Sequence, residues 1–139
     1  MRCSLAVFAV LALSATPALA ADVPNLVGKW SGEAQAVIIG PNPYRIPDSE
    51  GPNFPEAKIT FTYEITRQEG TRFSGTMSGG KFSETFIGAL KPPAYDSGVF
   101  VDVDGQYAFT LRNPTTIDVC YTHVYPNTRA VACWTMTKQ

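Results

Sequence analysis

Strict alternation of apolar and polar residues marks the segment 57–67. The residues of one parity are all apolar or aromatic: Ala57, Ile59, Phe61, Tyr63 and Ile65. Lysine, threonine and glutamate side chains occupy most positions between them. Because successive side chains of a β-strand point to opposite sides, this period of two predicts a strand with one buried face and one solvated face.

Shorter segments along the chain repeat this pattern, separated by turns rich in Gly, Pro, Asn and Asp. We predict further strands at 27–39, 72–78, 82–90, 99–102, 106–112, 117–124 and 129–137. Apart from one long loop, the connections are short, so neighbours in sequence should pair in space. Eight such strands predict an all-β, eight-stranded antiparallel up-and-down β-barrel, because closure removes unpaired sheet edges. A β-sandwich is the alternative, although its crossing connections are usually longer.

One hairpin, built around an Asp-Gly turn, admits two registers. With a tight type I′ turn, Asp102 would point inside the barrel. With a left-handed bulge at Gly105, Val99 and Val101 would point inside instead, and Asp102 would stay in water. We predict the second register, which exposes Phe100.

The last two strands form a hairpin that carries Cys120 and Cys133. Placing these cysteines opposite each other fixes four further pairs: Tyr121 with Ala132, Val119 with Trp134, Ile117 with Met136, and His123 with Ala130. This register gives one mostly apolar and one mostly polar face, and opposite residues lie within disulfide reach. We predict a disulfide that contributes about 3 kcal/mol. Two free buried thiols are the alternative.

The first twenty residues have the pattern of an export signal. Arg2 precedes a short apolar run, and an A-x-A cleavage pattern ends at Ala20. The run is too short for a transmembrane helix, which needs about 20 apolar residues. Removing residues 1–20 also removes Cys3 and leaves an even pair of cysteines, as expected in an oxidising compartment. We expect a single barrel domain over 21–139, periplasmic or secreted.

Charge and composition argue against several classes of partner. The chain carries 11 Lys and Arg against 12 Asp and Glu, without the basic run or patch of a nucleic-acid-binding protein. Polar outward residues of the segment 57–67 would face lipid in a membrane barrel. One histidine and a bridged cysteine pair leave no cluster of metal ligands. The stretch Asp102–Gly105 resembles the start of a calcium loop, but a hairpin turn explains it. We expect neither metal nor cofactor.

Two short motifs stand at the starts of predicted strands. Gly28-Lys29-Trp30 is a G-x-W sequence, and residues 70–75 read G-x-x-F-x-G. Together with the strand plan, they resemble the calycins, the group of lipocalins and avidins. The resemblance implies a barrel in which Trp30 plugs the closed end and a long first loop lies over the open end, where a small apolar ligand enters. The chain lacks the helix that follows the lipocalin barrel, and the biotin-binding residues of avidins have no counterparts here. The resemblance therefore implies a fold and not a particular ligand.

The long loop 40–56 contains five prolines, which forbid a helix or an inner strand. Such loops often serve as lids or binding loops, although an insertion that is merely packed or disordered fits as well.

Inward side chains near the end of the barrel that carries this loop would line a mouth. The candidate ligand-binding residues are Tyr63, Met77, Phe82, Glu84, Tyr107, Tyr121 and His123; Ile59 and Val101 would lie beside them. The residues expected to fill the opposite end, the floor, are Trp30, Ile65, Phe73, Leu111, Ile117 and Met136. Two alternatives stay open: the barrel is filled by its own side chains, or Glu84 faces solvent.

Three functions fit these features. The favoured one is the binding of a small, mostly apolar ligand in the mouth. A protein-binding module or enzyme inhibitor acting through the loop 40–56 is the second, with Tyr44, Ile46 and Phe54 as anchors. An isomerase or cyclase using Glu84 as acid or base is the third, but no catalytic motif supports an enzyme.

Overall fold

The computed structural model describes residues 22–41 and 50–139. This part of the chain forms nine strands: β1 (Gly28–Ala34), β2 (Ala36–Ile39), β3 (Ile59–Glu69), β4 (Arg72–Gly79), β5 (Phe82–Leu90), β6 (Ser97–Val101), β7 (Gly105–Asn113), β8 (Thr116–Tyr125) and β9 (Thr128–Lys138). No helix long and apolar enough to cross a membrane occurs in the described residues. The predicted export signal and residues 42–49 of the loop 40–56 lie outside them.

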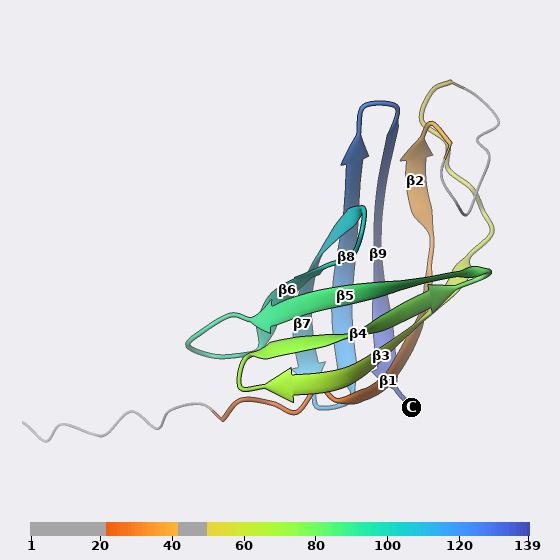
Figure 1. Ribbon diagram of the computed structural model, residues 1–139. Helices are drawn as coiled ribbons and strands as arrows, with labels where there is room; N and C mark the ends of the chain where they lie inside the picture. The colour runs from red at the N-terminus through yellow and green to blue at the C-terminus, as the bar shows by residue number, and fades with distance from the viewer. Residues whose placement is uncertain (1–21, 42–49) are drawn as a thin grey trace, which may run out of the picture.

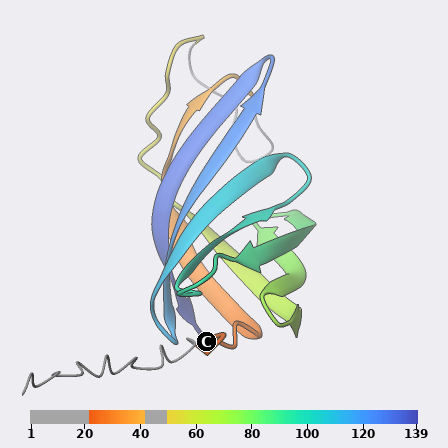
Figure 2. The same ribbon diagram turned by 90° about the vertical axis from the view of Figure 1, so that its left-hand side faces the viewer.

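The strands form one closed antiparallel sheet (Figures 1 and 2). Each strand from β3 to β9 pairs with the next in sequence, and β1 closes the ring by pairing with both β3 and β9. The prediction of an all-β, eight-stranded up-and-down barrel is confirmed, with one strand more than expected.

The additional strand arises because the predicted strand 27–39 divides at Gln35. Before this residue, β1 pairs with β3 through Ala34; after it, β2 leaves that partner and pairs with β9. In Figure 1, β2 stands beside the β8–β9 hairpin, which reaches well beyond β3, β4 and β5. This extension shapes the mouth of the barrel. Asn53, at the far side of the long loop, bridges back to Ile38.

A glycine begins each of the turns that follow β3 and β4. Glu69 pairs with Arg72 and Gly79 pairs with Phe82, so Gly70 and Gly80 are the first residues of the turns. Both glycines have φ of +58°. Because this left-handed conformation costs glycine little, the glycine that can adopt it sets the position of each turn.

The predicted register of the β6–β7 hairpin is wrong. Phe100 is only 5% exposed, whereas Val99 is 58% and Val101 is 39% exposed. The ring of Phe100 stacks on Tyr107, with centroids 4.1 Å apart. Burial of this large ring outweighs burial of the smaller valines. The carboxylate of Asp102 turns inward without penalty because it accepts hydrogen bonds there, as described below.

The register of the last hairpin is as predicted. Cys120 pairs with Cys133 and is joined to it by a disulfide. The other four predicted pairs are also present, from Ile117 with Met136 to His123 with Ala130. The alternation of the two strands therefore fixed their pairing correctly.

Large side chains fill the floor of the barrel. Trp30 is fully buried, and its indole N–H donates to the carbonyl of Leu26 at 2.9 Å. Five of the six predicted floor residues are buried, and Leu111 packs against them half-buried. A void of only about 20 Å³ remains among these side chains. The predicted floor is confirmed as a packed core.

Candidate functional site

A cavity of about 70 Å³ lies inside the mouth of the barrel. Small side chains form one wall: Ala34, Ala36, Ala130 and Ala132. Ala36 and Ala132 are direct partners in the β2–β9 ladder, so two methyl groups stand where larger residues would close the barrel. The cavity exists because these strands carry alanine on their inner face.

Aromatic rings form a second part of the lining: Phe61, Tyr63, Tyr107, Tyr121 and Trp134. The rings of Tyr107 and Tyr121 lie 4.7 Å apart. Tyr121 can lie flat against β7 because residue 105 is glycine; a Cβ there would stand 2.0 Å from the Tyr121 ring. The indole N–H of Trp134 is buried without a hydrogen-bond partner among residues 22–41 and 50–139.

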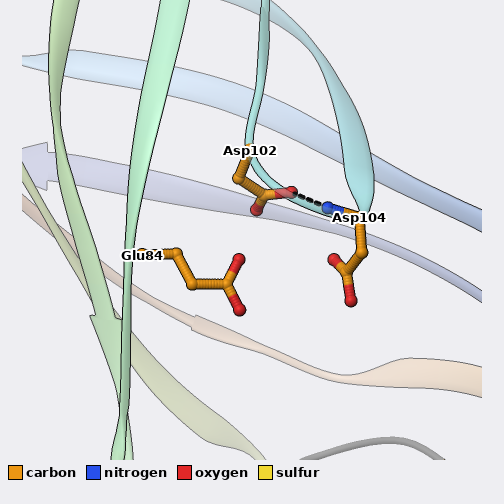
Figure 3. Close-up of side chains that lie close together, drawn as sticks. All are labelled: Glu84, Asp102 and Asp104. Carbon is orange, nitrogen blue, oxygen red and sulfur yellow. Dashed lines mark hydrogen bonds between the residues drawn. The ribbon is translucent and has the colours of Figure 1, made fainter.

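Three carboxylates meet at the polar end of the mouth (Figure 3). Glu84 projects from β5, and Asp102 and Asp104 come from the β6–β7 turn. Carboxylate oxygens of the three lie within 4.8 Å of one another. Among the described residues, this acidic cluster is the one group whose arrangement could hold a metal ion. The sequence analysis missed it, because the cluster depends on the β6–β7 register.

The turn itself holds Asp102 in place. One carboxylate oxygen accepts from the backbone N–H groups of Asp104, at 3.2 Å, and Gly105, at 2.7 Å. The other accepts from the Tyr107 hydroxyl at 2.7 Å. Asp104 accepts from the Tyr121 hydroxyl at 3.1 Å. Buried Tyr107 and half-buried Tyr121 therefore orient two of the three carboxylates.

The titration behaviour of these groups follows from burial and like charge. Burial raises the pKa of Glu84, and the negative charges of Asp102 and Asp104 raise it further, while a hydrogen bond from the Val103 backbone opposes the shift. Burial, aided by neighbouring carboxylates, also raises the pKa of Tyr107 and of Tyr121. Both tyrosines therefore stay neutral hydrogen-bond donors at physiological pH.

His123 lies beside this cluster and is only 6% exposed. Its Nδ1 is 3.5 Å from a carboxylate oxygen of Asp104 and 3.3 Å from the Tyr121 hydroxyl. Because that hydroxyl gives its proton to Asp104, these contacts favour, of the two neutral tautomers, the one with the proton on Nδ1. Nε2 is buried and has no hydrogen-bond partner in the described part of the chain.

Five of the seven predicted ligand-binding residues line the cavity: Tyr63, Met77, Tyr107, Tyr121 and His123. Glu84 points inward but belongs to the acidic cluster and does not line the cavity wall. Phe82 is 41% exposed at the start of β5 and lies outside the lining, as does Val101.

The loop anchors proposed for protein binding receive little structural description. Tyr44 and Ile46 lie outside the described residues, and Phe54 is 74% exposed.

The alanine wall, Trp134 and both aspartates are cavity residues that sequence reasoning missed. The pairing of His123 with Ala130 and of Tyr121 with Ala132 already implied space opposite two large rings. That signal was available in the sequence. The inward position of Asp102 was not, because it depends on partners brought by other strands.

No protein-family model matches the chain, and no curated protein or solved structure matches it either. The interpretation of the site therefore rests on its own geometry.

Proposed function

We propose that this protein is an exported, calycin-like barrel that binds a small, mostly apolar ligand in the mouth cavity. The observation that supports this function is the contrast along one interior. Large side chains fill the floor to a void of about 20 Å³, whereas the mouth keeps about 70 Å³ between alanines and aromatic rings. A barrel of this size can fill itself with side chains, so an open mouth is a feature of the sequence and not of the fold.

The size of the cavity limits the ligand. Pockets that enclose a drug-sized molecule have volumes of roughly 300–1,000 Å³. A space of about 70 Å³ accepts a short aliphatic group, and the remainder of a larger ligand would extend out of the mouth. The apolar walls favour contact with a hydrocarbon group, while the tyrosine hydroxyls and carboxylates would orient a polar end of the ligand.

Native mass spectrometry of protein produced in an oxidising compartment tests this proposal. We expect a bound mass that denaturation releases. An Ala130→Phe substitution fills the cavity from β9 and should abolish the bound mass. Val131→Phe is the matched control, because Val131 is the next residue of the same strand and is 48% exposed on the outer face. Retention of the bound mass by a folded Ala130→Phe variant would place the ligand elsewhere and contradict the proposal.

A further inference from the structure

We propose that the ligand of the mouth cavity is a small organic amine in its protonated form, with its ammonium group held by the acidic cluster and His123. This inference deepens the proposed function and rests on it. Charge, hydrogen-bonding capacity and wall chemistry support it in turn.

The first argument is uncompensated negative charge. Glu84, Asp102 and Asp104 stand together at the end of a largely apolar cavity. The ion pairs that Lys and Arg form within the described residues all involve other carboxylates. Carboxylates a few ångströms apart repel each other, and partial burial weakens the screening by water. A cation placed among them would remove this repulsion.

The second argument is an unused acceptor on His123. With the proton on Nδ1, the buried Nε2 presents a lone pair that no described residue uses. One oxygen of Glu84 is likewise buried without a hydrogen-bond partner in the described part of the protein. A buried polar atom left unpaired costs free energy. Both atoms are acceptors, so the missing partner is a donor, and a primary ammonium group has three N–H donors.

The third argument is the aromatic wall. Tyr107, Tyr121 and Trp134 surround the space next to the carboxylates. The faces of such rings attract cations, with about 0.5–2 kcal/mol per contact depending on desolvation. A carboxylate or phosphate ligand would meet repulsion from both the cluster and the rings.

The same features favour an organic cation over a metal ion. Asp102 already accepts from two backbone N–H groups and from the Tyr107 hydroxyl, so it would act on a bound cation through its negative charge and not as a direct metal ligand. A divalent ion would also leave the apolar space beside the four alanines empty. A short alkylammonium ion uses both parts of the site, because its carbon chain contacts Ala130 and Ala132 while its head group meets the acceptors.

Three probes with the same four-carbon tail test the inference at about pH 7: butylammonium, 1-butanol and butanoate. Two-dimensional ¹H–¹⁵N NMR offers a built-in reporter, since Trp134 lines the cavity and the indole N–H of Trp30 is hydrogen-bonded in the floor. We expect butylammonium to shift the Trp134 signal, leave the Trp30 signal unchanged, and bind about tenfold tighter than butanol, a difference of about 1.4 kcal/mol. Butanoate should bind weakest.

Replacing a carboxylate by the amide of the same shape tests whether that carboxylate causes the preference for the ammonium ion. Glu84→Gln and, separately, Asp104→Asn should each reduce butylammonium affinity several-fold and reduce butanol affinity much less. Glu64→Gln is the control, because Glu64 is exposed on the outer face of β3. Two separate variants guard against one that fails to fold, which circular dichroism would reveal.

The outcomes separate this inference from the proposed function. Equal or tighter binding of butanol or butanoate would overturn the ammonium assignment and leave ligand binding intact. Binding of none of the three probes to the wild-type protein would overturn both proposals. A Ca²⁺ titration that shifts the same signals and excludes butylammonium would reassign the cluster to a metal ion and overturn the inference.

Discussion

The floor and the mouth of the barrel are built by the same strands yet differ in what fills them. β3 contributes Ile65 to the floor and Ile59 to the mouth, both on its inner face. Around Ile65 lie Phe73, Trp30 and other large side chains that leave almost no void. Around Ile59 lie alanines, tyrosines and the cavity. The difference teaches that one continuous core can be tightly packed at one end and open at the other.

Truncation of Ile65 and, separately, of Ile59 to alanine should give the largest effect and test the difference in packing between floor and mouth. Ile65→Ala removes a side chain that is 6% exposed and tightly packed, so we expect a loss of about 2–5 kcal/mol in the free energy of unfolding. Ile59→Ala removes the same atoms beside an existing cavity and should cost about 1 kcal/mol, because less packing is lost. Urea unfolding followed by circular dichroism measures both. Equal losses at the two sites would show that the mouth is packed like the floor.

Removal of the disulfide should have the next largest effect. Cys120 and Cys133 join β8 to β9, and the chain model for a loop of this size predicts a loss of about 3 kcal/mol. Denaturant titrations of a Cys120→Ser, Cys133→Ser double variant measure it. The reduced wild-type protein should lose a similar amount, since the hairpin keeps its pairing without the bond. An unchanged midpoint would show that the unfolded chain is restricted by residual pairing of β8 with β9 and not by the disulfide.

Neutralisation of Glu84 should have the smallest effect, with the opposite sign. Because the pKa of Glu84 is raised in the folded protein, its ionised form destabilises the unliganded barrel. This penalty is absent below the unfolded pKa of about 4.3 and complete above the folded pKa. Glu84→Gln should therefore stabilise the protein by about 0.5–1 kcal/mol at neutral pH, with no gain at about pH 3. Thermal unfolding across this range measures the difference. A stability gain that persists at about pH 3 would show that it comes from the changed shape of the side chain and not from the loss of its charge.

Much of the architecture could be predicted because alternation acts locally. The inner face of β3 and the four pairs flanking the disulfide follow from residues adjacent in sequence. The division of the first strand at Gln35 could not be predicted, because it depends on β9 offering a partner to β2.

The acidic cluster could not be predicted for a related reason. Sequence reasoning placed Asp102 in water because a buried carboxylate without partners is costly. Its partners are the turn amides and the Tyr107 hydroxyl, and they are identified only once the register of Phe100 is known. Aromatic burial decided that register, and the position of the carboxylate followed from it.

The seam between β1 and β9 sets the order in which the barrel can assemble. Trp30 pairs with Lys138, and the Lys138 ammonium group donates to the carbonyl of Asn25, 113 positions earlier in the chain. Contacts between such distant residues form late, because a long stretch of chain must first be brought together. The hairpins from β3 to β8 can form while the polypeptide is still being synthesised, but the ring cannot close until β9 is present. The barrel therefore stays an open sheet until its first and last strands meet.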